Sequence, residues 1–225
     1  MKLKNHPNNI TTVDEWFAIC PPKKGEKQWA VGRSAKELAK YMVNSLPSVP
    51  QEVETALQTL VPADAEFDWD AEYVTSLPGT GEGRNHDVIL YNQDIVVTIE
   101  AKADETLGNL IKEEISGASV NKLYRISKLL DCLFQGGFKD YPELRYQLLT
   151  AAVGTLLETE KRGCKSAVML VLVFESNGKV SNEKVLANHK DVEAFLHAAN
   201  ACKENNLYVI PNNMGIQLYF KEIVI

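Results

Sequence analysis

Two adjacent runs rich in β-branched residues constrain the fold of this chain more than any other segment. Residues 86–91 (HDVILY) and 95–102 (IVVTIEAK) are separated only by the polar residues Asn92, Gln93 and Asp94. Branched side chains favour strands, and Asn and Asp favour tight turns. The segment therefore predicts an antiparallel hairpin.

Counting along the two runs predicts which side chains share a face of this hairpin. If residues 92–93 form the loop, Asp87 lies opposite Thr98. Because alternate residues of a strand point to the same face, Asp87 then shares its face with Glu100 and Lys102. Asp87 and Glu100 become diagonal neighbours with Cβ atoms roughly 7 Å apart, which is close enough for both carboxylates to reach one cation.

The other face of the hairpin is apolar and predicts a core face. Its side chains are Val88, Leu90, Ile95, Val97, Ile99 and Ala101. Ile89 and Val96, on the face that carries the charges, indicate that this face is also covered over part of its length. The three charged groups would then lie at its open end.

The composition indicates one ordinary globular domain over residues 1–225. The chain is 45% hydrophobic and 24% charged, which is enough to bury a full core. Its longest apolar run, residues 167–174, is far shorter than the roughly 20 residues that span a bilayer, so no membrane is expected as a partner. The basic N-terminus lacks an apolar signal region, so we expect a cytoplasmic protein. Residues 1–30, with a linker-like Pro-Pro-Lys-Lys-Gly segment, are expected to form a loosely ordered arm.

Periodicity and turn residues predict the remaining elements. Helices are expected at residues 34–45, 51–60, 107–134, 143–161 and 191–204, and strands at 67–77, 167–174, 207–210 and 217–224. A three-strand meander followed by a helical crossover into a buried strand predicts an α/β fold, with a mixed central sheet flanked by helices on both faces. Residues 104–141 form a helical insertion between the meander and that crossover.

Charge and cysteine content limit the function classes. The net charge is −6, residues 52–82 carry eight acids and no base, and residues 23–40 are mainly basic. A basic arm beside an acidic cleft is compatible with phosphate binding around a metal site, and equally with a solvated helix face. The four cysteines are scattered without metal-binding spacing, so we expect free thiols and no zinc site.

Two carboxylates and a lysine at one sheet edge suit hydrolysis of a phosphodiester, because hard oxygen ligands hold Mg²⁺ and a lysine can stabilise developing negative charge. In these residues and in element order, residues 51–175 resemble the PD-(D/E)XK nuclease superfamily. The resemblance implies a restriction-endonuclease-like core, with Asp87, Glu100 and Lys102 as the catalytic residues. It also implies Mg²⁺ or Mn²⁺ held by Asp87, Glu100 and the backbone carbonyl of Ala101, with Lys102 assisting the attacking water.

Further positions are accessory candidates that the resemblance implies. Such nucleases often add an acid from the first helix or strand, for which Glu54 and Glu72 are the candidates. They also often use a polar residue on the helix after the meander, where Arg145 and Gln147 stand. Arg84 ends the glycine-rich loop before Asp87 and is a candidate for substrate contact.

The expected function is a metal-dependent endonuclease that acts on nucleic acid, with DNA favoured. A homodimer is compatible with a double-strand cutter, and residues 104–141 could supply a lid or a dimer contact. The alternative is a non-catalytic binding or regulatory module on the same fold, with 104–141 as its partner surface. The hairpin could also carry nothing more than a Glu100–Lys102 ion pair and a solvated Asp87. The sequence leaves open DNA against RNA, the recognition sequence and the oligomeric state.

Overall fold

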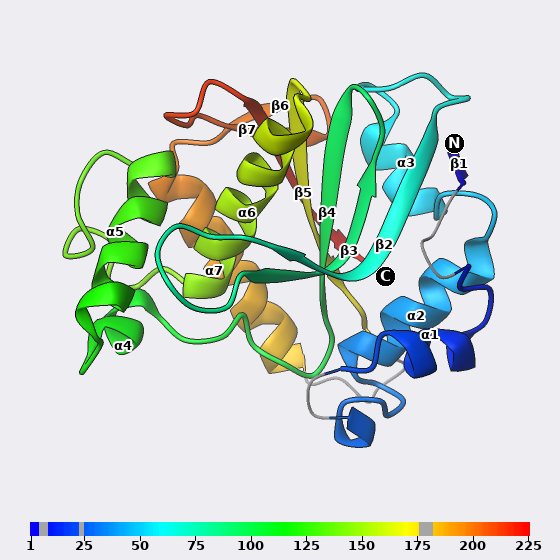
Figure 1. Cartoon of the computed structure of the whole chain (residues 1–225), viewed down its shortest axis with the longest axis horizontal. Helices are drawn as coiled ribbons and strands as arrows, with labels where there is room; N and C mark the ends of the chain where they lie inside the picture. Colours follow the sequence, from blue (N-terminus) through cyan, green and yellow to red (C-terminus); the bar gives the residue numbers. More distant parts are fainter. Residues whose placement is uncertain (5–8, 23–24, 176–181) are drawn as a thin grey trace.

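The structure, a computed structural model, describes residues 1–4, 9–22, 25–175 and 182–225, and it has three layers, with an eight-stranded sheet between two layers of helices (Figure 1). The spatial order of the strands is β1-β2-β3-β4-β5-β8-β7-β6. The strands are β1 (Lys2–Leu3), β2 (Glu66–Thr75), β3 (Arg84–Tyr91), β4 (Ile95–Lys102), β5 (Ser166–Val173), β6 (Cys202–Glu204), β7 (Leu207–Ile210) and β8 (Gln217–Val224).

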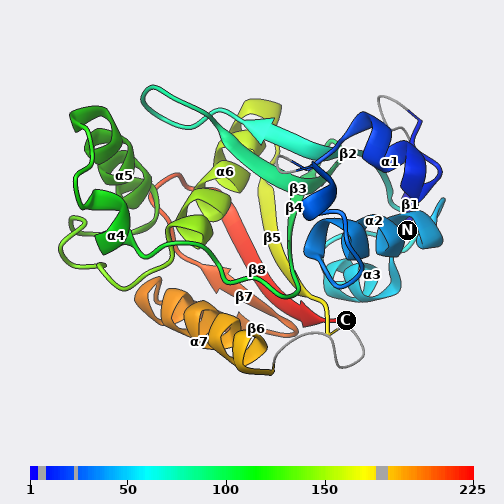
Figure 2. The ribbon, with the colours of Figure 1, turned by 90° about the horizontal axis from the view of Figure 1, so that it is seen from below.

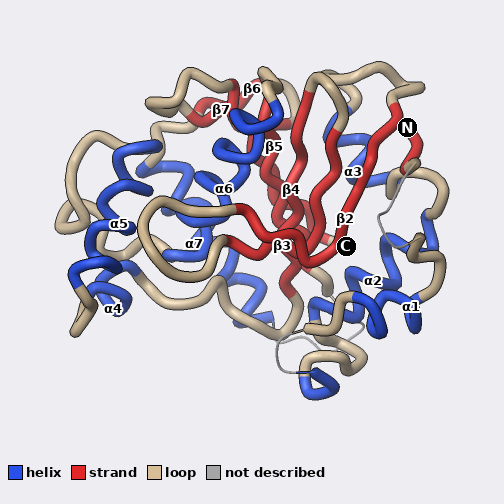
Figure 3. Tube along the Cα trace, in the orientation of Figure 1, coloured by secondary structure: helices blue, strands red, loops and turns tan. Residues whose placement is uncertain are grey.

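The sheet is mixed, as the sequence predicts. Strands β2, β3 and β4 form the expected antiparallel meander, while β4, β5 and β8 run parallel. Strands β8, β7 and β6 return antiparallel, and β1 adds a short parallel edge to β2. Figure 3 shows β2, β3 and β4 side by side, with the long loop between β2 and β3 reaching toward α5.

One face of the sheet packs against the N-terminal helices. These are α1 (Val13–Ile19), α2 (Ser34–Ser45) and α3 (Gln51–Leu57), beside the one-turn helix Gly25–Lys27. Met42 and Leu57 are buried against Val97 and Leu170 in one apolar cluster. Figure 2 shows this layer on one side of the strands and the later helices on the other.

The opposite face packs against the later helices. These are α4 (Ile111–Ile115), α5 (Val120–Leu133), α6 (Tyr146–Arg162) and α7 (Asn182–Ala198). Leu149 on α6 and Phe195 on α7 are buried with Met169 and Val171 of β5 in a second apolar cluster. Within the described ranges, we find no helix of the length and apolarity needed to cross a membrane.

Several predicted bounds need correction. Helix 34–45 is confirmed, whereas the expected helix 107–134 is divided into α4 and α5. The prediction of a helix over 191–204 is wrong at both ends, because α7 begins at Asn182 and ends at Ala198. Asn200, with a left-handed φ of 50°, ends the helical path, and the residues after it pair with β7 as β6.

The first 30 residues contribute to the core where the structure describes them. Strand β1 pairs with β2, and the Trp16 side chain on α1 lies 5.7 Å from that of Trp69, centroid to centroid. Trp16 is only 2% exposed. The expected linker-like segment includes residues 23–24, which lie outside the described residues.

The hairpin loop is one residue later than predicted. Asn92 donates its backbone N–H to the Ile95 carbonyl at 3.1 Å, and the Asn92 side-chain oxygen accepts the N–H groups of Asp94 and Ile95. The loop is therefore residues 93–94, and Ile89, not Asp87, pairs with Thr98. Because the register moves by two residues, no side chain changes face.

Strand β5 is the buried centre of the sheet, so its side chains should dominate the stability of the fold. We expect Leu170→Ala to lower the free energy of unfolding by about 2–5 kcal/mol, because the side chain is fully buried and leaves a cavity. The matched variant Leu186→Ala, on the exposed surface of α7, should change it by about 0.5 kcal/mol or less. Chemical denaturation measures both. Equal losses would contradict this placement of the core.

Candidate active site

Glu100 and Lys102 lie at the end of β4 on the face that α6 covers. The two side chains are separated by one residue and point the same way, as the period of a strand requires. Lys102 Nζ donates to Glu100 Oε1 at 2.7 Å, and Lys102 and Glu100 are 6% and 3% exposed. This pair is therefore a buried ion pair at the edge of the apolar core, where an unpaired charge would be costly.

Two further donors complete the environment of Glu100. Arg84, the first residue of β3, donates Nη2 to Glu100 Oε2, and Gln147 on the first turn of α6 donates Nε2 to Oε1. Burial acts to raise the pKa of Glu100, but the cations of Arg84 and Lys102 outweigh it and hold that pKa below its ordinary value. Glu100 is therefore an ionised, fully coordinated carboxylate.

Asp87 lies beside Glu100, where strands β3 and β4 separate. Their ladder ends at the pair Val88–Ile99, and beyond it the Asp87 Oδ2 atom accepts the backbone N–H of Ala101 at 2.7 Å. Burial, and then the charge of Glu100, raise the pKa of Asp87 to about 8. These contacts place Asp87 next to the segment that carries Glu100 and Lys102.

A break in strand alternation brings more side chains to this place. On β2, Ala71 packs in the cluster formed with the N-terminal helices, yet Tyr73, two residues later, donates its hydroxyl to Glu158 of α6 at 2.7 Å. Residues two apart on a regular strand point to one face. Glu72 between them has a left-handed φ of 52°, which turns the strand over.

The neighbouring strand changes face at the same level. Val88 packs toward the N-terminal helices, whereas His86 lies against Gly154 of α6, where a Cβ on that glycine would come within 2.8 Å of His86 Nε2. The face change at Asp87 thus places Arg84 and His86 under α6 with Glu100. Alternation read from the sequence alone assigns these side chains to the wrong face.

His86 is a buried neutral base. Burial, and then the positive charge of Arg84, lower its pKa to about 3, and its Nε2 atom has no hydrogen-bond partner among the described residues.

The accessory candidates divide into two groups. Gln147 and Arg84 contact Glu100 directly, and Glu72, which accepts a hydrogen bond from Asn85, is close enough for its charge to raise the pKa of Asp87. The structure therefore brings these three to the site.

Arg145 and Glu54 have other partners. Arg145 donates Nε to Asp191 of α7 at 2.8 Å and Nη1 to the Gly108 carbonyl at 2.7 Å. Glu54 accepts the N-terminal amine of Met1 at 2.8 Å, near the start of β2 and away from Asp87. Both side chains join parts of the scaffold, and neither contacts the cluster around Glu100.

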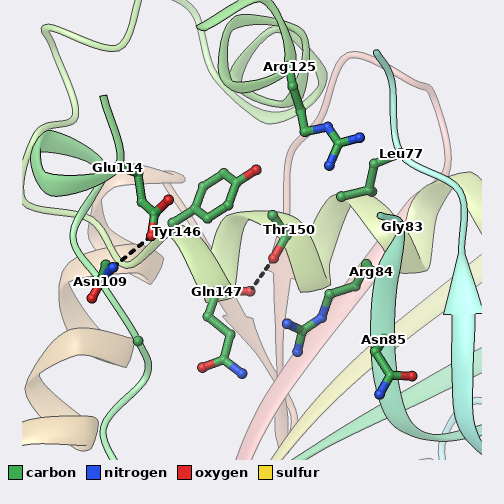
Figure 4. A pocket seen from close by; sticks show the side chains of 11 residues that line it. Leu77, Gly83, Arg84, Asn85, Asn109, Glu114, Arg125, Tyr146, Gln147 and Thr150 are labelled. Atoms are coloured by element: carbon green, nitrogen blue, oxygen red, sulfur yellow. Dashed lines mark hydrogen bonds between the residues drawn. The ribbon is translucent and has the colours of Figure 1, made fainter. Parts of the chain in front are cut away.

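A pocket of about 400 Å³ opens beside this cluster (Figure 4). Arg84 and Gln147 line it from the side of Glu100, and Arg125 and Tyr146 line it from the side of α5. Sequence reasoning missed Arg125 and Tyr146. Nothing in the local sequence of Arg125 indicates a site, because its partners lie more than 40 residues away, whereas Tyr146 stands between the candidates Arg145 and Gln147.

Arg125 fixes the wall of this pocket. Its guanidinium donates to the carbonyl oxygens of Pro78, Thr80 and Glu82 at 3.0, 2.7 and 2.7 Å. One side chain of the helical insertion thus holds the glycine-rich loop between β2 and β3. The loop is a pocket wall, and it ends at Gly83, where a Cβ would meet the Thr75 carbonyl at 2.3 Å.

Asp87 and Glu100 are the residues here that could hold a metal ion. Among the residues that the structure describes, no group of three His, Cys, Asp or Glu side chains is arranged to hold one. Mg²⁺ needs only one or two protein carboxylates, because it keeps several waters and binds substrate phosphate. Arg84 and Lys102 supply the positive charge next to Glu100 in this structure.

A family model described as a domain of unknown function, DUF6946, matches residues 9–224. The chain belongs to the DUF6946 family. No curated protein and no solved structure matches it. The matched part of this DUF6946 chain contains every residue of the site and all strands except β1.

The raised pKa of Asp87 predicts a pH-dependent stability of this DUF6946 domain. The pKa of Asp87 is about 8 in the folded state, against an ordinary value of 3.8. The protonated Asp87 therefore contributes stability that is fully present below pH 3.8 and is lost as the pH rises through 8. The lowered pKa of His86 has the opposite effect on stability. The neutral His86 contributes stability above pH 6.5, and this contribution is lost as the pH falls below 6.5. Between pH 6.5 and 8, Asp87 is therefore the member of this pair that governs the slope.

We expect urea denaturation to show a free energy of unfolding that falls from pH 6.5 to 8 by at most about 1.4 kcal/mol per pH unit. Asp87→Asn should flatten this slope, because the amide does not ionise. Asp94→Asn, at the exposed hairpin loop, should retain it. The same slope in wild type and Asp87→Asn would show that Asp87 is not under charge repulsion.

Arg125 generates a separate prediction for the loop. Arg125→Ala removes three charge-assisted hydrogen bonds of about 1.5–3 kcal/mol each, so amide hydrogen exchange of residues 79–83 should accelerate at least about tenfold. Lys128→Ala, on the same helix but paired with Asp131, should leave this exchange unchanged. Unaltered exchange in Arg125→Ala would mean that the loop is held by other contacts.

Proposed function

We propose that this DUF6946 domain is a metal-dependent endonuclease that hydrolyses phosphodiester bonds of DNA, built on a restriction-endonuclease-like core. The observation that carries the proposal is the convergence of Asp87, Glu100 and Lys102 at the point where β3 and β4 separate. Two carboxylates and an amine in one partly covered site are an arrangement suited to phosphoryl chemistry.

The order of the elements supports the proposal. A helix, α3, is followed by the meander β2-β3-β4, the crossover helix α6 and the parallel strand β5. The resembled superfamily has this order of core elements, with its acids on the second and third strands of the meander. The insertion, residues 104–141, packs beside α6 through α5.

The electrostatics of Asp87 and Glu100 fit a hard divalent cation. The charge of Glu100 helps to raise the pKa of Asp87, and a cation bound by both carboxylates would stabilise the ionised form of Asp87. The side chains of Asp87 and Glu100 and the carbonyl of Ala101 would hold Mg²⁺ or Mn²⁺. When bound, the ion would supply a lowered pKa for a coordinated water and charge stabilisation for the substrate phosphate.

The side chains of the chain itself have separable roles in this proposal. Gln147 holds the Glu100 carboxylate in one orientation through its amide. Lys102 has its ammonium group 2.7 Å from Glu100, where it can orient the attacking water and stabilise negative charge that develops on the phosphate. Without a metal ion, Arg84 neutralises the charge of Glu100. When a metal ion binds Glu100, Arg84 can instead contact a substrate phosphate.

One observation favours the alternative function, a non-catalytic binding or regulatory module. The carboxylate of Glu100 already accepts hydrogen bonds from Arg84, Lys102 and Gln147, which is the pattern of a structural ion-pair network. Calorimetric titration with Mn²⁺ separates the two functions: an endonuclease binds the ion, and a structural network does not.

Cleavage of supercoiled plasmid DNA tests the proposal directly. We expect Mg²⁺- or Mn²⁺-dependent nicking that stops with EDTA, and we expect Asp87→Asn and Lys102→Ala to lower its rate on the order of 10²-fold or more, because each removes a group that acts on the reacting phosphate. Asp94→Asn, on the same hairpin but exposed, should retain the rate. Undiminished nicking by Asp87→Asn would show that any cleavage occurs elsewhere.

A further inference from the structure

The pocket beside Glu100 is assembled from three segments far apart in the sequence. The start of β3 contributes Arg84, the insertion contributes Arg125, and the start of α6 contributes Tyr146 and Gln147. Its volume of about 400 Å³ is within the range of small-molecule sites in proteins. Arg84 and Gln147 contact Glu100 as well, so a ligand in this pocket is one side chain away from the proposed reaction site.

The walls of the pocket are fixed before any ligand binds. Arg125 holds the loop through three carbonyl oxygens. Across the pocket, Glu114 is ion-paired with Lys122 and accepts a hydrogen bond from Asn109 at 2.9 Å. The single carboxylate of the described lining is thus paired with a cation, and the other charged groups of the lining are Arg84, which is paired with Glu100, and Arg125.

The lining combines one aromatic ring, two guanidinium groups and several amides and hydroxyls. Tyr146 supplies the ring, and Lys122 Nζ lies 6.0 Å from its centroid. Among the described residues, two buried polar atoms near this pocket, Arg84 Nε and Asn85 Oδ1, have no hydrogen-bond partner. An aromatic face, amides that can pair with the edge of a base, and cations for phosphate together match a nucleotide.

A second pocket continues the first. It has a volume of about 340 Å³ and shares Arg125 and Tyr146 with the first pocket, and it adds Thr80, Ser119 and Lys122. The two hollows therefore adjoin each other at Arg125 and Tyr146. The second hollow lies at the N-terminal end of α5, where Ser119 and Lys122 line it.

We propose that these two pockets bind successive nucleotides of an unpaired strand of nucleic acid, with one base against Tyr146 and the phosphates near Arg84, Arg125 and Lys122. The bases of a duplex are stacked and cannot enter a pocket unless they leave the helix. The preferred substrate therefore carries a single-stranded segment, such as a flap, a gap or a frayed end. The binding of a single strand does not depend on the proposed nuclease function. The cleavage of the bound strand does.

Fluorescence anisotropy with EDTA present tests binding without cleavage. We expect a short labelled oligothymidine to bind roughly tenfold or more tightly than a blunt duplex of equal length, and Tyr146→Ala to weaken its binding about tenfold, since one stacked base is lost. Tyr146→Phe should bind as wild type does, because the ring remains. An oligouridine of equal length shows whether the site distinguishes DNA from RNA.

The control is Tyr208→Ala, at the other end of the sheet on β7. Tyr208 is also half-buried, and Lys203 Nζ lies 5.9 Å from its ring centroid. The variant therefore removes a similar cation–π pair at a place distant from the pocket. It should leave oligothymidine binding unchanged. Thermal melts of Tyr146→Ala and Tyr146→Phe verify that both variants are folded.

The outcomes separate this inference from the proposed function. Tighter binding of the duplex, or equal binding by wild type and a folded Tyr146→Ala, would overturn the inference even if metal-dependent cleavage through Asp87 persists. Tyr146-dependent binding of the single strand supports the inference even if no cleavage occurs, in which case the nuclease proposal fails alone.

Discussion

The buried carboxylate of Glu100 is the interaction on which the rest of the site depends. A charge at the edge of an apolar core requires partners, and three different segments supply them: Arg84 from β3, Lys102 from β4 and Gln147 from α6. The contact with Gln147 joins the meander to the crossover helix, and the contact with Arg84 joins β3 to β4. Stability and chemistry are therefore coupled here, because replacing Glu100 would leave two buried cations without a counter-charge.

The reversal of strand faces at Glu72 and Asp87 makes these contacts possible. Regular alternation would direct Arg84 and His86 toward the N-terminal helices. Left-handed backbone at Glu72 costs free energy, and the non-glycine residue there persists because the neighbouring contacts of Tyr73 and His86 under α6 hold it. Backbone strain of this kind gathers at functional sites, and here it lies beside the acid with the raised pKa.

The sequence was informative where a local pattern decides the structure and silent where distant contacts do. Branched residues and a turn predicted the hairpin, and the error in the loop did not change the predicted faces of its paired residues, because a shift of two residues preserves the face. The error arose from Asn92, whose side chain accepts two backbone N–H groups and moves the turn. The role of Arg125 has no local signature, since its three partners come from a loop over 40 residues away.

We propose that Asp87 and Glu100 form a divalent-metal site in which a cation replaces Arg84 as the partner of Glu100. A crystal structure grown with Mn²⁺ tests it most directly through the anomalous signal of the ion. We predict an anomalous peak at about 2.1 Å from an oxygen of Asp87 and of Glu100, close to the Ala101 carbonyl, with Arg84 turned into the pocket. A structure without such a peak, with Arg84 still on Glu100 at saturating Mn²⁺, would contradict the claim.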